Sequence, residues 1–131
     1  MAEKFRKKDP MGIQVYCTDE QWDGHIIEGH PEMKDNIQAV VSTIEDPDYI
    51  YESNDSDPPM DDRRIYNRID AGGTYDKYTP VTKVVVSVLG GSGEVVTAYN
   101  AKTVTGGAMQ DESGGYKEAI YVAPRNQNKL R

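Results

Sequence analysis

The most regular part of the chain reads V-T-K-V-V-V-S-V-L (residues 81–89), G-G-S-G (90–93) and E-V-V-T-A-Y-N-A (94–101). β-Branched residues dominate both outer runs, and such residues favour strands. The glycines between them allow the tight turn that a hairpin requires. The pattern therefore predicts a β-hairpin, and the other elements are assigned outward from it. In its second strand, alternation places Val95, Thr97 and Tyr99 on one face and Val96 and Ala98 on the other.

Two shorter strands are predicted before the hairpin. Residues 63–69, R-R-I-Y-N-R-I, alternate, and the isoleucine face is expected to pack against the core. The opposite face then presents two cations and a phenol, from Arg64, Tyr66 and Arg68. Residues 49–53, Y-I-Y-E-S, are typical of a further strand, and the segment 54–62, with its aspartates and prolines, is typical of a solvated loop.

Two helices are predicted before these strands. Thr18 followed three residues later by Gln21 is a capping-box pattern, so the first helix is expected to begin at Asp19. It is expected to fail at Gly29, because glycine is a poor helix former, and Pro31 suits the first turn of a new helix. One apolar stripe runs along this second helix: Met33, Ile37, Val40, Val41 and Ile44.

This order predicts an α+β fold in which two N-terminal helices pack on one face of a four- to five-stranded, mostly antiparallel sheet. The length of 131 residues suits a single domain. Residues 1–10 are polar and are expected to form a flexible leader. Residues 11–131 then form the domain, and 101–131 are a C-terminal extension that contains one more strand or an edge segment.

Composition restricts the possible functions. The formal net charge of −7 argues against binding nucleic acid by bulk electrostatics, since phosphates are usually neutralised by surplus lysine and arginine. The acidic residues concentrate between Glu45 and Asp62, so the rest of the chain is close to neutral and compatible with a local basic cleft. No apolar run reaches the roughly 20 residues of a membrane span. The lone Cys17 lies in an apolar run and is expected to be a buried filler rather than a nucleophile.

Both histidines and the only tryptophan lie in W-D-G-H-I-I-E-G-H-P-E, residues 22–32. On an unbroken helix His25 and His30 would not share a face, but a break at Gly29 would let them converge on one cleft. Paired imidazoles suit acid–base chemistry near neutral pH. Equally, His25 is compatible with an interfacial role and His30 with a helix cap. A metal site is less well supported, because the spacing differs from the H-E-x-x-H zinc pattern.

On the predicted sheet, the polar residues Arg64, Tyr66, Arg68, Thr97 and Tyr99 are expected near the histidines. Hydroxyl and guanidinium groups on neighbouring strands are typical of a surface that faces a substrate. The alternative is an antiparallel sheet with one solvated face, where the same residue types are common. This alternative applies most strongly to Arg68 and Lys83, and less to Thr97 and Tyr99.

The order of these motifs resembles the phage-associated branch of the barnase/EndoU/colicin/RelE-like (BECR) nuclease superfamily. The resemblance covers roughly residues 15–100. It is carried by H-I-I-E-G-H-P-E at 25–32, I-E-D-P-D-Y-I-Y at 44–51, R-R-I-Y at 63–66, V-V-V at 84–86 and V-V-T-A-Y at 95–99. The fold that it implies, two helices on a four-stranded antiparallel sheet, agrees with the one derived above.

The resemblance implies a metal-independent ribonuclease that cleaves RNA by attack of the 2′-hydroxyl and leaves a 2′,3′-cyclic phosphate. It assigns catalysis to His25, His30, Thr97 and Tyr99, and substrate binding to Arg64, Tyr66 and Arg68. One imidazole would take the 2′-hydroxyl proton, a second group would protonate the leaving 5′-oxygen, and hydrogen-bond donors would stabilise the phosphorane. The acidic balance of the chain departs from what is typical of a free RNA-cleaving toxin.

The leading hypothesis is therefore an endoribonuclease of the toxin or phage-effector type, acting without metal or cofactor. Its expected partners are an RNA substrate, with tRNA as one candidate, and a cognate inhibitor or immunity protein. Its expected place of action is the cytoplasm, its own or that of a target cell, with no membrane association. The first alternative is a non-catalytic binding or structural module of the same fold. The second is a metal-dependent enzyme that uses both histidines.

Overall fold

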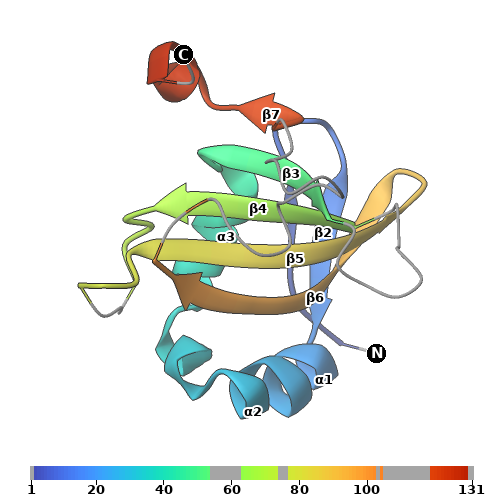
Figure 1. Ribbon diagram of the computed structural model, residues 1–131. Coiled ribbons are helices and arrows are strands. Elements are labelled where there is room, and N and C mark those ends of the chain that lie inside the picture. Colours follow the sequence, from blue (N-terminus) through green and yellow to red (C-terminus); the bar gives the residue numbers. More distant parts are fainter. Residues whose placement is uncertain (1, 54–62, 74–76, 103, 105–118, 130–131) are drawn as a thin grey trace.

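A single seven-stranded sheet organises the chain in the computed structural model, which describes residues 2–53, 63–73, 77–102, 104 and 119–129 (Figure 1). The strand order across the sheet is β1-β2-β6-β5-β4-β3-β7. Its four central strands form an antiparallel meander: β3 (Tyr49–Ser53), β4 (Arg63–Ile69), β5 (Val81–Leu89) and β6 (Ser92–Ala101). The predicted hairpin and both shorter strands are thus confirmed.

The hairpin turn depends on glycine. Gly90 has a positive φ of 64°, a conformation that L-residues with a Cβ rarely adopt. Leu89 and Ser92 pair across this turn, and β5 and β6 remain paired to Val81 and Ala101. The expected loop at 54–62 lies outside the described residues.

The N-terminal segment corrects the sequence prediction. Residues Glu3–Lys8 form β1, which pairs antiparallel with β2 (Gln14–Thr18), so the expected flexible leader is instead an edge strand. β2 in turn pairs parallel with the start of β6. At the other edge, β7 (Tyr121–Val122) pairs with β3 and precedes the 3₁₀-helix η4 (Pro124–Lys129). The α+β class is confirmed, but the sheet is mixed and larger than the four to five antiparallel strands expected.

The first helical segment begins where the capping pattern predicts. The Thr18 side chain accepts a hydrogen bond from the Gln21 backbone N–H at 3.1 Å. The segment comprises α1 (Asp19–Gln21), the π-helix η1 (Trp22–Ile26) and α2 (Ile27–Gly29). It ends at Gly29, as predicted, because His30 leaves the helical region with φ −139° and ψ 75°. Pro31 then opens a 3₁₀-helix.

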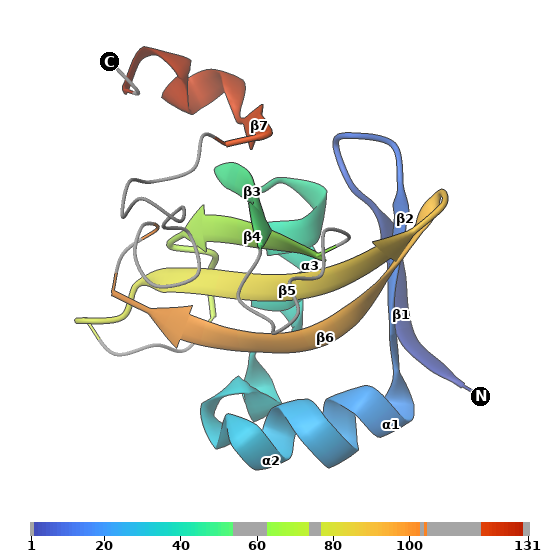
Figure 2. The same ribbon diagram turned by 45° about the vertical axis from the view of Figure 1, so that its right-hand side comes forward.

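The second predicted helix forms as two pieces, the 3₁₀-helix η2 (Pro31–Asp35) and the α-helix α3 (Ile37–Glu45). The apolar stripe faces the core as expected, with Met33, Val40 and Ile44 fully inaccessible and Ile37 partly buried. Figures 1 and 2 show α3 packed across the sheet, while the segment from α1 to α2 lies alongside β6. There the Gln21 side-chain amide donates to the Val96 carbonyl at 2.5 Å.

Both faces of the sheet carry apolar clusters. The larger is the helix-side cluster, which contains Trp22, Ile26, Val40, Ile44, Ile50, Tyr66, Val84, Val86, Val95 and Ala98, among others. The smaller, on the opposite face, contains Tyr51, Ile65 and Val85. We call that opposite face the outer face. Because apolar clusters lie on both faces of the sheet, the alternation of residues along a strand does not by itself show which face is polar.

A bulge in β6 changes which residues share a face. Val95 pairs with Val86 and Thr97 with Val85, so Val96 has no cross-strand partner in this register. Val95 and Ala98 consequently lie together in the helix-side cluster, whereas Val96 and Tyr99 pack against the outer cluster. The expected grouping of Val95 with Thr97 and Tyr99 is therefore wrong.

Candidate functional site

His30 and Tyr99 form the contact around which the candidate site is built. Their rings stack with centroids 5.3 Å apart and an interplanar angle of 28°. His30 is half-buried, and its Nδ1 lies 3.6 Å from a carboxylate oxygen of Glu32. The imidazole reaches β6 because the chain leaves helical geometry after Gly29, so the break that the sequence predicts also positions this histidine.

Lys83 is the cross-strand neighbour of Tyr99 on β5, and its side chain belongs to the same face. Only 6% of the residue is exposed, and Nζ donates a hydrogen bond to the Val104 carbonyl at 2.8 Å. Burial lowers the pKa of Lys83 to about 8, because desolvation disfavours the ammonium form. A lysine that can exchange its proton near neutral pH therefore lies beside the ring that His30 contacts.

The same row of the sheet continues onto β4. Asn67 pairs with Lys83 across the strands and is fully buried. Its side-chain amide donates to the Ile65 carbonyl at 3.1 Å, while Oδ1 has no hydrogen-bond partner among the described residues. Thr97 lies on the same face, opposite Val85. The outer face thus combines an imidazole, a lysine, a phenol and a hydroxyl, which suits proton transfer beside an anion.

His25 lies apart from this contact. It is exposed, in the π-helical turn η1, and in the described part of the chain no hydrogen bond, ion pair or ring contact links it to His30. π-Helical turns inside α-helices occur frequently at functional sites. The catalytic roles assigned to His25 and His30 both stay predictions, and of the two only His30 contacts Tyr99.

Arg64 and Tyr66 occupy the helix-side face, opposite His30 and Tyr99. Strand register places Arg64 beside Val86 and Tyr66 beside Val84, both in the helix-side cluster. Tyr66 is completely buried, and its hydroxyl donates to the carboxylate of Asp9 at 2.5 Å. Burial, followed by the Asp9 carboxylate, raises the pKa of Tyr66 far above its usual range. The expectation that these residues face a substrate beside Thr97 and Tyr99 is therefore wrong.

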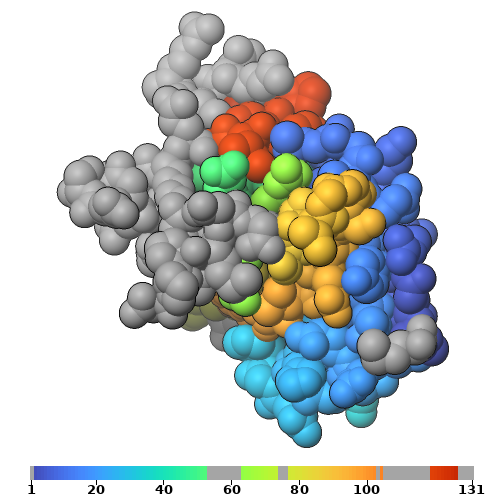
Figure 3. All heavy atoms as spheres, turned by 90° about the vertical axis from the view of Figure 1, so that its right-hand side faces the viewer, coloured from blue at the N-terminus to red at the C-terminus, as the bar shows by residue number. Residues whose placement is uncertain are grey.

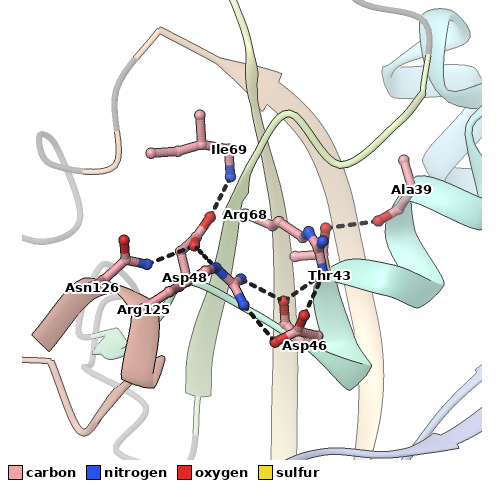
Figure 4. Close-up of polar contacts among 8 residues, drawn as sticks. All are labelled: Ala39, Thr43, Asp46, Asp48, Arg68, Ile69, Arg125 and Asn126. Carbon is pink, nitrogen blue, oxygen red and sulfur yellow. Dashed lines mark hydrogen bonds and ion pairs between the residues drawn. The ribbon is translucent and has the colours of Figure 1, made fainter.

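Arg68 is engaged in a structural ion-pair network (Figure 4). Its Nη1 lies 3.0 Å from Asp46 Oδ2 and donates to the Asp46 carbonyl at 2.9 Å. Arg125 bridges Asp46 and the buried Asp48, with Nε 2.8 Å from Asp48 Oδ1. This network ties the end of α3 to β4 and to η4. Arg68 thus connects β4 to the end of α3 through Asp46, and its expected role in substrate binding stays a prediction.

Asp48 is the buried centre of this network (Figure 4). Besides Arg125, its carboxylate accepts hydrogen bonds from the Asn126 side chain at 2.6 Å and from the Ile69 backbone N–H at 2.7 Å. These partners come from two separate parts of the chain, the end of β4 and η4. The segment that precedes β3 is therefore fixed by polar contacts as well as by the sheet.

The environment of Cys17 does not favour a reactive thiolate. Cys17 is fully buried, and desolvation, with Glu94 and Asp19 adding to it, raises the pKa of its thiol to about 12. The prediction of a buried filler is confirmed for this residue. In the described ranges, no three His, Cys, Asp or Glu side chains are grouped so as to hold a metal ion.

Lys83 is the site residue that sequence analysis did not select. The available signal was a single lysine inside the β-branched run V-T-K-V-V-V, where a charge must be accommodated within a buried strand. That signal is ambiguous, since a lysine on a solvated strand face looks the same in sequence. Only the cross-strand register and the burial of the residue separate the two cases.

Comparison with known proteins adds no further constraint. No model of a known protein family matches the chain, and no curated protein or solved structure is significantly similar to it. None of the helices in the described ranges is long and apolar enough to cross a membrane. The functional argument therefore rests on the geometry of the outer face.

Proposed function

We propose that this protein is an endoribonuclease that cleaves RNA through attack of the 2′-hydroxyl and leaves a 2′,3′-cyclic phosphate. The observation that carries the proposal is the stacking of His30 on Tyr99 beside the buried Lys83. The motifs that resemble BECR nucleases contain two of these three residues. RNA is the expected substrate, and a cognate inhibitor is the expected protein partner.

The proton transfers of such a reaction suit these groups. His30, as a neutral imidazole, accepts the 2′-hydroxyl proton while the 2′-oxygen bonds to phosphorus. The leaving 5′-oxygen then takes a proton as its bond to phosphorus breaks. Lys83 has a pKa of about 8 and a supply of N–H donors, so it can donate that proton or stabilise the negative phosphorane.

The hydroxyls complete the proposed site. Thr97 and Tyr99 share the outer face with Lys83 and supply hydrogen-bond donors for the phosphorane oxygens. Tyr99 also supports the His30 ring, which limits its orientations. No step requires a metal ion, because the imidazole and the ammonium provide the base and the positive charge.

The experiment is incubation of purified protein with fluorescently labelled RNA in excess EDTA, followed by analysis of the product ends. We expect cyclic-phosphate ends from the wild type and a loss of at least about 100-fold in rate for His30→Ala, since acid–base catalysis typically contributes 10²- to 10⁴-fold. Glu28→Ala, an exposed change in the same helical segment, is the control for nonspecific effects.

Two further outcomes separate the alternatives. If His25→Ala is as inactive as His30→Ala, the paired-histidine assignment implied by the resemblance holds and Lys83 has a supporting role. If RNA stays intact at high concentrations of wild type and both variants, the nuclease proposal is wrong. A non-catalytic binding module of this fold then becomes the better description.

A further inference from the structure

A depression lies where β1 meets the helical segments that follow β2. It has a volume of about 470 Å³, which is within the usual range of small-molecule sites, and its lining comprises Lys4, Trp22, Asp23, Ile27, Lys34 and Ile37. We call it the Trp22 depression. In Figure 3 the dark-blue N-terminal strand lies against the lighter-blue helical segments. The six lining residues are distinct from those assigned to RNA cleavage.

An irregularity in β1 directs side chains toward this depression. The register with β2 shifts between Glu3 and Phe5, so Lys4 has no cross-strand partner and forms a bulge. Regular alternation would send Lys4 and Phe5 to opposite faces. Instead both reach η1, since the Phe5 ring meets Trp22 edge-on at 6.4 Å between centroids and Lys4 Nζ lies 3.5 Å from Asp23 Oδ1. Bulges at sheet edges commonly re-aim a side chain in this way.

The first helical segment is irregular at the same place. Trp22 and Asp23 open the π-helix η1, a rare conformation that occurs frequently at functional sites. The third charged residue of the lining, Lys34, comes from the 3₁₀-helix η2. A β-bulge and a π-helix thus supply side chains to one depression. This convergence favours a built ligand site over an incidental gap in the packing.

The inner wall of the Trp22 depression is apolar. Trp22 is only 3% exposed and belongs to the helix-side cluster. Ile27 and Ile37 are half-buried and pack against the same cluster. A ligand that covers these side chains removes further apolar surface from water, which favours binding in proportion to the area covered.

The rim of the depression has one surplus positive charge. Lys4 forms its ion pair with Asp23, whose side chain is 64% exposed. Lys34 is exposed and has no hydrogen bond or ion pair with any residue in the described ranges. A single carboxylate can therefore pair with Lys34, whereas a group with two negative charges is also repelled by Asp23. The depression thus suits an apolar molecule that carries one negative charge.

We propose that the Trp22 depression binds an organic monocarboxylate with an aliphatic body, of the class of free medium-chain fatty acids. The aliphatic chain covers Trp22, Ile27 and Ile37, and the carboxylate pairs with Lys34. This site is independent of the proposed nuclease function, because it lies on different elements and involves no cleavage.

The test titrates octanoate into the full chain and records the fluorescence of Trp22, the only tryptophan. We expect a saturable change. Octanoate should bind at least about 50-fold tighter than acetate, since each buried methylene contributes about fourfold. Octylammonium has the same chain and the opposite charge, so it should bind at least about tenfold more weakly than octanoate. The more highly charged octyl phosphate should bind no more tightly than octanoate, because Asp23 opposes the added charge.

Three single substitutions locate the carboxylate. Lys34→Gln should weaken octanoate binding about three- to fivefold, the scale of one exposed ion pair. Asp23→Asn should strengthen it about threefold, because the change frees Lys4 to pair with the ligand, and a gain in affinity cannot result from misfolding. Lys8→Gln makes the same charge change as Lys34→Gln at an exposed position of β1 outside the lining, and it should leave the affinity unchanged.

Absence of a saturable change in Trp22 fluorescence, or equal binding of octanoate and octylammonium, would overturn this assignment. So would an octanoate affinity that Lys34→Gln leaves unchanged. Tighter binding of octyl phosphate than of octanoate would show that the ligand is not a monocarboxylate.

Discussion

His30 stacks on Tyr99 with 5.3 Å between ring centroids, although one residue ends a helical segment and the other lies within a β-strand. The contact joins the break after Gly29 to the outer face of the sheet. It also brings an imidazole next to the row that contains Lys83. The contact between His30 and Tyr99 thus depends on the helix break after Gly29 and on the register of β6, which also places Lys83 beside Tyr99. Each of these features can be tested separately.

Tyr99 can act through its ring or through its hydroxyl, and two substitutions separate these roles. Tyr99→Phe keeps the stacking on His30 and removes a donor, so we expect kcat for RNA cleavage to fall about tenfold. Tyr99→Leu removes both, and a loss of about 100-fold is expected. Single-turnover cleavage assays measure both values. A Leu variant as active as the wild type would remove Tyr99 from the site.

Tyr66→Phe tests the division of the sheet into two faces. The buried hydroxyl donates to Asp9, whose carboxylate also accepts from the backbone N–H groups of Met11 and Ile13 at 2.9 Å. Removing the donor leaves the buried carboxylate short of a partner, so the free energy of unfolding should fall by about 1 to 3 kcal/mol. The cleavage rate should stay unchanged, because Tyr66 lies opposite the proposed site.

Urea denaturation and an RNA cleavage assay on the same Tyr66→Phe preparation measure both effects. Tyr78→Phe is the matched control, since that ring is 64% exposed. A large fall in cleavage rate with unchanged stability would place the Tyr66 hydroxyl in the catalytic site, against the register described here.

Asp48 and Asp46 provide a second matched pair for stability. Asp48→Ala leaves the Ile69 N–H and the Asn126 amide without a buried acceptor, so we expect a loss of about 2 to 3 kcal/mol. The Asp46 side chain is 52% exposed, and its ion pairs with Arg68 and Arg125 are largely solvent-screened. Asp46→Ala should therefore cost at most about 1 kcal/mol. Equal losses in urea denaturation would contradict the buried role of Asp48.

Local patterns in the sequence predict the elements well, for identifiable reasons. The glycine turn defines the hairpin, the Thr18 hydroxyl starts the first helix, and Gly29 ends it. Each of these signals acts over a few residues. β1 escapes prediction because its charged residues resemble a solvated tail, and its pairing with β2 depends on a turn held by buried Asp9.

The site is harder to predict because it depends on which face each residue occupies. The bulge at Val96 changes the faces within β6, and the sequence carries no visible mark of it. In the sequence, Tyr66 resembles an exposed phenol. In the structure its hydroxyl is buried and donates a hydrogen bond to the carboxylate of Asp9. His30 and Tyr99 were selected from the sequence, and the structure brings them into contact. Both could be selected because a histidine after a helix break and a tyrosine on a central strand are local features.

Lys83 makes both stability and activity depend on pH. Its pKa is about 8 in the folded protein and 10.5 in the reference state, so the folded protein releases this proton first as pH rises. Between these values the unfolded chain binds more protons, and the free energy of unfolding therefore increases with pH. Below pH 8 the buried ammonium costs stability in full. Cleavage should have the opposite trend above pH 8, because the ammonium that stabilises the phosphorane is lost.

Lys83→Met removes the titrating group and keeps an unbranched side chain in the strand. The difference in unfolding free energy between wild type and variant should shift by about 1 to 2 kcal/mol in favour of the wild type from pH 7 to 9.5, after allowance for solvent screening. Urea denaturation across this range measures it. Lys34→Met, at an exposed position on η2, should show no such shift.

The Lys83 variant should also lose the fall in cleavage rate above pH 8, since its residual activity no longer depends on this ammonium. A difference between wild type and Lys83→Met that is flat from pH 8 to 9.5 would show that Lys83 keeps an ordinary pKa, and a fall in cleavage rate above pH 8 would then have to come from another group.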